Sequence, residues 1–102
     1  MLLRSSGRNK YRLNWFDLET TGLNPFKDEI IEVAVLNNDG KKYDSLVKPN
    51  KRITPFITNI THITNEMVEE QPDEETVLRK FVEFIKSDNP EKQPIYLIGH
   101  NI

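Results

Sequence analysis

The order of its apolar segments is the feature of this 102-residue sequence that most constrains its fold. Three runs of strand length come first, at residues 11–18, 29–36 and 42–47, and turn-forming residues separate them. The Asn-Asn-Asp-Gly at 37–40 is typical of a hairpin, so the second and third strands should be antiparallel. A fourth apolar run, at 94–99, follows a helical segment, and a strand entered from a helix usually lies parallel to an earlier strand. These patterns predict an α/β fold with a mixed sheet: an antiparallel three-strand meander, helices, then a parallel fourth strand beside a central first strand.

The helical segment lies between the third and fourth strands. We expect residues 51–63 to form a loop and Thr64 to cap a short helix over 65–70. A longer helix should begin at Pro72-Asp73 and end before Asn89-Pro90. Its apolar side chains recur at helical spacing and should form one face: Val77, Leu78, Phe81, Val82 and Ile85.

Composition excludes several classes of protein. The chain has no cysteine, which rules out disulfides, Cys-ligated zinc and a thiol nucleophile, and which fits a reducing compartment. No apolar run approaches the roughly 20 residues that a membrane span needs, and Arg4 interrupts the only apolar start. We therefore expect an intracellular protein, cytoplasmic or nuclear, without a targeting segment or a membrane partner. The length fits one domain or part of a larger one.

Charge is distributed unevenly although the net charge is only -2. Residues 1–16 carry four basic side chains and no acid, whereas residues 66–91 carry nine acids and three bases. Solvated surfaces explain both runs, and a basic arm that contacts phosphate is the alternative for the first. We expect residues 1–10 to be a flexible basic N-terminus and residues 11–102 to form the folded unit.

Asp17 and Glu19 are the residues most suggestive of chemistry. They lie two positions apart on the first predicted strand, so both carboxylates should point to the same face, together with Trp15. Acids at the end of an apolar strand are costly to bury without compensation, and divalent cations accept carboxylate oxygens readily. A solvent-facing strand end is the alternative explanation.

Four segments carry a resemblance to a known family. Residues 16–23 (FDLETTGL), 28–35 (DEIIEVAV) and 99–101 (GHN) resemble motifs of the DEDD (DnaQ-like) 3′–5′ exonucleases. Residues 60–67 (ITHITNEM) resemble a segment of the proofreading exonucleases of bacterial replicative polymerases. The resemblance runs from about Asn14 to the end of the chain. It implies a ribonuclease H-like fold and metal-dependent hydrolysis of phosphodiester bonds at the 3′ end of single-stranded DNA or RNA.

The resemblance also implies roles for particular residues. Asp17 would bridge two Mg²⁺ ions, with Mn²⁺ a possible substitute, and Glu19 would hold one ion and help to place the attacking water. The backbone at Thr20 and Thr21 would meet the terminal nucleotide, and Leu23 would wedge against its base. Structural alternatives are that the two threonines only shape a turn and that Leu23 belongs to the core.

Three further substrate contacts are implied later in the chain. The loop at His62 and Ile63 would close over the terminal nucleotide, and Asn101 would contact the substrate near the scissile bond. Ile63 as a core residue and Asn101 as a helix cap are the structural alternatives. His62 stands where the family has glycine, so the loop could differ there or the imidazole could touch phosphate.

Not all of the family's acids are found in the sequence. Glu32 is a third candidate, with its role open, and the family's third carboxylate would follow soon after Ile102. We therefore expect an incomplete exonuclease domain, truncated before the remaining strand and helices and inactive by itself. The leading hypothesis is the N-terminal part of a 3′–5′ exonuclease for DNA proofreading or repair, or for RNA trimming, with a DNA polymerase as a candidate partner. The alternatives are a non-catalytic nuclease-like module that binds nucleic acid or protein, and a metal-dependent phosphatase.

Overall fold

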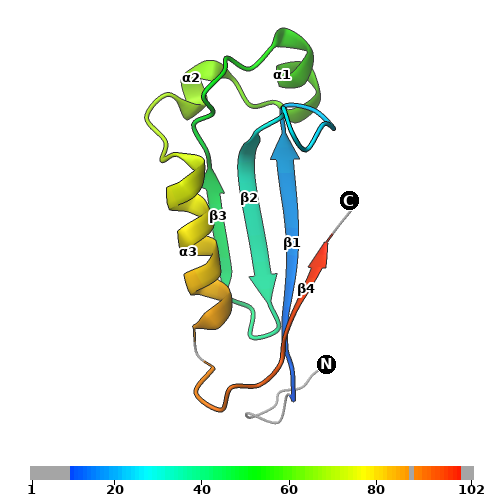
Figure 1. Cartoon of the computed structure of the whole chain (residues 1–102), viewed down its shortest axis with the longest axis vertical. Helices are drawn as coiled ribbons and strands as arrows, with labels where there is room; N and C mark the ends of the chain where they lie inside the picture. Colours follow the sequence, from blue (N-terminus) through cyan, green and yellow to red (C-terminus); the bar gives the residue numbers. More distant parts are fainter. Residues whose placement is uncertain (1–9, 88, 100–102) are drawn as a thin grey trace.

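The computed structural model describes residues 10–87 and 89–99, which contain four strands and three helices (Figure 1). In chain order the elements are β1 (Arg12–Thr20), β2 (Ile30–Asn37), β3 (Lys42–Leu46), α1 (Pro55–Thr61), α2 (Asn65–Val68), α3 (Glu74–Lys86) and β4 (Ile95–Gly99).

The strands form one sheet with the order β3-β2-β1-β4. β2 pairs antiparallel with both β1 and β3, and β4 pairs parallel with β1. The predicted mixed sheet is therefore confirmed, including the internal position of the first strand. The hairpin between β2 and β3 turns at Gly40, whose φ of 84° is one that glycine adopts without strain. The Asn37 side chain closes this turn by accepting hydrogen bonds from the backbone N–H groups of Asp39 and Lys41.

Helix α3 covers one face of the sheet, next to β2 and β3 (Figure 1). Asp73 caps this helix by accepting a hydrogen bond from the Thr76 N–H at 2.9 Å. Val77 is completely buried against Val33 and Val47, and the rings of Phe16 and Phe81 meet edge to face at 6.2 Å. Burial of an aliphatic side chain contributes about 1.5–3 kcal/mol, so these contacts fix the helix on this face.

A second apolar cluster lies where α1 and α2 meet the end of the sheet. Its buried members come from β2, from α2 and from the segments just before and just after α1: Ile31, Ile53, Ile63 and Val68. Asn65 connects two of these segments, because its side chain accepts from the Ile53 N–H and donates to the Ile53 carbonyl. This cluster holds the helical segment over the end of β1 and β2.

The prediction of a loop over residues 51–63 was wrong for Pro55–Thr61, which form α1. The Thr- and Ile-rich sequence of this segment has modest helix propensity, so the sequence did not indicate a helix here. Thr54 caps the helix by accepting from the Ile57 N–H, Pro55 occupies the first turn, and His62 ends it in the left-handed conformation. The capping role predicted for Thr64 is confirmed at the start of α2.

The opposite face of the sheet has no helix over it in the described part of the chain (Figure 1). Trp15, Leu36 and Ile98 lie side by side across β2, β1 and β4 on this open face, and each is substantially exposed. Within residues 10–87 and 89–99, no helix combines the length and the apolar character needed to cross a bilayer.

Candidate active site

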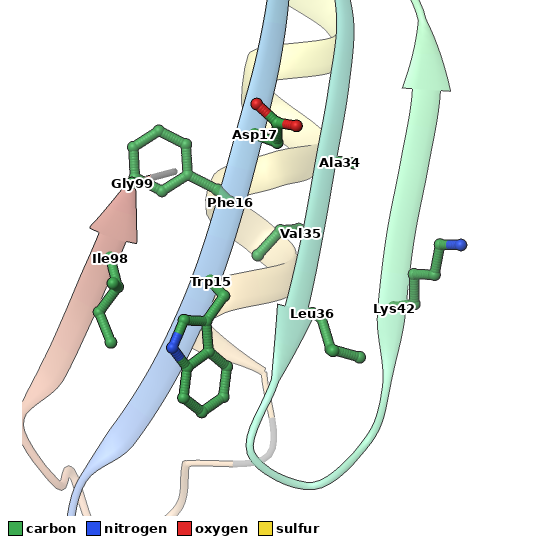
Figure 2. Close-up of a pocket in the computed structure, with 9 residues that line it drawn as sticks. All are labelled: Trp15, Phe16, Asp17, Ala34, Val35, Leu36, Lys42, Ile98 and Gly99. Carbon is green, nitrogen blue, oxygen red and sulfur yellow. The ribbon is translucent and has the colours of Figure 1, made fainter. Parts of the chain in front are cut away.

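Asp17 and Glu19 lie near the C-terminal end of β1, and both point to the open face. Phe16 and Leu18, which alternate with them, pack toward α3, so the predicted division of faces is confirmed. Figure 2 shows Asp17 and Trp15 on the side of the sheet that is turned away from α3. Asp17 is exposed and Glu19 is half-buried. The two carboxylates therefore face solvent from a strand whose other face is in the core.

The oxygens of these two carboxylates are available as ligands. Neither carboxylate accepts a hydrogen bond from any residue in the described ranges. Two hard oxygen donors on one face suit a divalent cation such as Mg²⁺. The described residues include no group of three or more acidic or imidazole side chains that could hold a metal ion by themselves. The metal-binding role predicted for the pair therefore remains a prediction, and it would need further ligands.

Glu32 and Asp44 add negative charge to the same face. Glu32 lies opposite Glu19 on β2, and Asp44 lies opposite Ala34 on β3. Burial raises the pKa of Glu32, and a hydrogen bond and repulsion from Asp44 raise it further, with smaller repulsion from Glu19 and Asp17. The sequence left the role of Glu32 open and did not indicate Asp44, whose position depends on the β2–β3 register. A cation on this face would relieve the repulsion.

A groove of about 400 Å³ runs along the open face beside Asp17 (Figure 2). Trp15, Leu36 and Ile98 are among its apolar lining residues, and Lys42 lies at its β3 side. Apolar walls next to a carboxylate resemble the general form of ligand sites, in which few polar groups set the orientation.

The turn after β1 is held by its own side chains. The Thr20 hydroxyl donates to the Gly22 carbonyl at 2.6 Å, and the Thr21 hydroxyl donates to Asp28 and accepts from the Glu29 N–H. The Thr21 N–H donates to the Glu29 carbonyl at 2.9 Å. A Cβ at Gly22 would lie only 2.5 Å from an Asp28 oxygen, so a larger residue here would displace the Asp28 carboxylate. Both threonines therefore shape the turn, as the structural alternative stated, and any contact with substrate would come in addition to that role.

Leu23 and Ile63 differ sharply in exposure. Leu23 is 99% exposed on the turn, which excludes the core alternative within the described structure and leaves it free to contact a ligand. Ile63 is 3% exposed and belongs to the cluster under α1 and α2, which favours the core alternative for its side chain. A second apolar residue of the turn, Phe26, is 95% exposed, and no sequence pattern pointed to it.

His62 is exposed and has φ 66° and ψ 18°, with its N–H donating to the Thr58 carbonyl at 2.7 Å. This left-handed conformation is most easily adopted by glycine, which explains why a glycine would suit the position. Asn101 and its neighbour His100 lie outside the described residues, so the role predicted for Asn101 remains a prediction.

Comparison with protein families decides the relationship. The profile of the RNase T family, described as "Exonuclease", matches residues 14–100. The chain belongs to this exonuclease family. The resemblance to the DEDD exonucleases is thereby confirmed, and it includes the strand that carries Asp17 and Glu19.

Curated proteins similar to this chain include DNA polymerases. The chain is 40% identical over 90 residues to "DNA polymerase III PolC-type" of Caldanaerobacter subterraneus subsp. tengcongensis, which covers 84% of this chain and 6% of that protein. It is 47% identical over 91 residues to the protein of the same name from Ureaplasma parvum serovar 3, and that match also covers 84% of this chain and 6% of the relative. The chain thus spans about one-sixteenth of the length of these relatives.

Solved structures show the same fold. The nuclease domain of 3′hExo, described as a DEDDh family member bound to rAMP, superposes with a TM-score of 0.70 over 93% of this chain and 54% of that chain, at 24% identity. A full-length 3′-exonuclease superposes with a TM-score of 0.69 over 86% of this chain and 45% of that chain, at 27% identity. The arrangement of four strands and helices is therefore that of DnaQ-like exonucleases.

Proposed function

We propose that this chain forms the first part of the active centre of a metal-dependent 3′–5′ exonuclease. The observation that carries the proposal is the placement of Asp17 and Glu19, within the family match, as neighbouring acids on the open face at the end of β1. The PolC-type relatives favour DNA as the substrate and a DNA polymerase as the partner. The substrate would be the 3′ end of a single strand.

Each residue has a role that its position supports. Asp17 and Glu19 would hold divalent metal, which when bound makes hydroxide available near neutral pH and stabilises the departing oxygen. The Glu32 carboxylate, on the neighbouring strand, adds negative charge close to Asp17 and Glu19. Leu23 is exposed where it can contact the terminal base, and Thr20 and Thr21 hold the turn that presents it.

Manganese binding tests the proposal directly. We expect the chain to bind Mn²⁺, measured by calorimetry or by the loss of the free Mn²⁺ spin-resonance signal, and the Asp17→Asn/Glu19→Gln double variant to lose that binding. The matched control is Glu69→Gln/Glu70→Gln, which removes the same charge from exposed positions after α2. Binding of equal strength by the Asp17/Glu19 double variant would refute the proposal.

Trimming of a 5′-labelled oligonucleotide is the second measurement. We expect no robust activity from the 102 residues by themselves, because two carboxylates only partly neutralise a pair of divalent cations. Any Mg²⁺-dependent trimming, by this chain or by a longer polypeptide that carries it, should disappear in the Asp17/Glu19 double variant.

A non-catalytic nuclease-like module is the second candidate. It is favoured by the observation that the described residues contain no group of three metal-binding side chains. This candidate predicts that wild-type protein binds no Mn²⁺ while still binding nucleic acid or protein, so the same titration separates the two functions.

A further inference from the structure

Phe26 is a large aromatic side chain displayed to solvent at the tip of the β1–β2 turn. It is 95% exposed, although the full burial of a phenylalanine is worth about 1.5–3 kcal/mol. The turn leaves β1 directly after Glu19 and Thr20, so the ring is displayed close along the chain to the acidic pair. Leu23, on the same turn, is 99% exposed, so two apolar side chains are displayed together next to the acidic pair.

The backbone under Phe26 is ordered by hydrogen bonds within the turn. The Asn24 side chain accepts from the Phe26 N–H at 2.9 Å, and the Asn24 carbonyl accepts from the N–H groups of Lys27 and Asp28. Asp28 in turn accepts from the Asn24 N–H at 2.7 Å. The ring is thus held on a preorganised support, which lowers the entropy lost when a ligand binds.

Basic side chains stand next to this turn. The Glu29 carboxylate accepts hydrogen bonds from the backbone N–H groups of Asn50 and Lys51, at 2.7 and 3.0 Å, and so joins the segment before α1 to the end of the turn. The backbone of Lys51 is therefore held at the end of the turn that carries Lys27, and Arg52 follows it in the chain.

Lys27, Lys51 and Arg52, here called the cationic rim, are all exposed and form no ion pair with a carboxylate of the described residues. The nearby carboxylates of Asp28 and Glu29 are both occupied by backbone N–H groups. These two carboxylates keep their negative charge, but their oxygens are engaged, so the three cations of the rim are available to an anionic partner.

We propose that Phe26 and the cationic rim bind the single strand upstream of its 3′ end, with a base stacked on Phe26 and phosphates against Lys51 and Arg52. An exposed ring bordered by cations is the arrangement that binds single strands without sequence preference. The proposal rests on the proposed function, because the acidic pair defines where the 3′ end would lie. It extends the binding site beyond the terminal nucleotide.

Fluorescence anisotropy with labelled oligo(dT) in EDTA tests the stacking contact. We expect Phe26→Ala to weaken binding of an oligonucleotide of about 12 nucleotides by roughly fivefold or more, and to leave one of about 3 nucleotides nearly unaffected. Phe26→Trp should restore the affinity, whereas Phe26→Leu, which keeps an apolar side chain without a ring face, should not. Because Phe26 is exposed, far-ultraviolet circular dichroism should show all three variants folded.

The salt dependence of the same binding tests the rim. Lys51→Gln/Arg52→Gln should reduce the slope of log affinity against log salt by about 1.4, since each phosphate contact on a single strand contributes roughly 0.7. The matched control is Lys80→Gln/Lys86→Gln, which removes two exposed positive charges from α3 and should leave the slope unchanged.

The outcomes separate this proposal from the proposed function. Absence of oligo(dT) binding, or wild-type affinity and slope in the Phe26→Ala and Lys51/Arg52 variants, would overturn the binding surface whatever the Mn²⁺ titration shows. Loss of affinity in these variants with no Mn²⁺ binding by the wild type would support the surface and refute the metal-dependent activity.

Discussion

Replacing Gly22 by alanine should destabilise the protein through a single identifiable clash. The added Cβ would lie 2.5 Å from Oδ2, 2.7 Å from Cγ and 2.9 Å from Oδ1 of Asp28. Asp28 would have to move, and its carboxylate would lose the bonds from the Asn24 N–H at 2.7 Å and the Thr21 hydroxyl at 3.1 Å. A hydrogen bond to a charged group is worth roughly 1.5–3 kcal/mol. Since the turn is largely exposed, we take the lower end and expect a loss of about 2–3 kcal/mol.

Urea unfolding followed by the fluorescence of Trp15 measures this loss, and a double-mutant cycle tests its cause. Asp28→Ala removes the atoms that the new Cβ would meet, so it should cost about as much as Gly22→Ala. In the Asp28→Ala background, Gly22→Ala should then cost little, giving a coupling of about 2 kcal/mol. Additive effects of the two substitutions would show that the contact with Asp28 is not what requires glycine.

Two other substitutions probe the same end of the molecule. His62→Gly should stabilise the chain by about 1 kcal/mol, because a left-handed residue other than glycine costs roughly 1–2 kcal/mol and the greater freedom of unfolded glycine offsets part of the gain; a lower urea midpoint would contradict this. Glu32 has a raised pKa, chiefly through burial, so its stabilising contribution is present below the ordinary Glu pKa of about 4.3 and is lost as the pH rises through the raised value of the folded state. Glu32→Gln should therefore remove this decrease in stability with rising pH and make the protein more stable than wild type at neutral pH. An unchanged pH profile of the unfolding free energy would show that Glu32 is not its cause.

Local patterns predicted the framework well because strands and caps depend on neighbouring residues. Alternation along β1 assigned Asp17 and Glu19 to one face and Phe16 and Leu18 to the other, and the structure has that division. The turn residues at 37–40 predicted the hairpin, and Gly40 has the positive φ that they indicated. The sequence alone also placed the acidic pair at the end of its strand.

Contacts between distant segments decided the rest. Asp44 lies near Glu32 because of the β2–β3 register, and Lys51 lies near the β1–β2 turn because Glu29 binds its backbone. Helix α1 forms from residues with modest propensity because Ile53 and Ile63 at its ends are buried in a cluster with Ile31. The amino-acid sequence by itself thus determined the order of the elements and the faces of the strands, since these follow from local stereochemistry. Only the tertiary structure determined which charges and rings lie together, because that depends on packing between residues far apart in the chain.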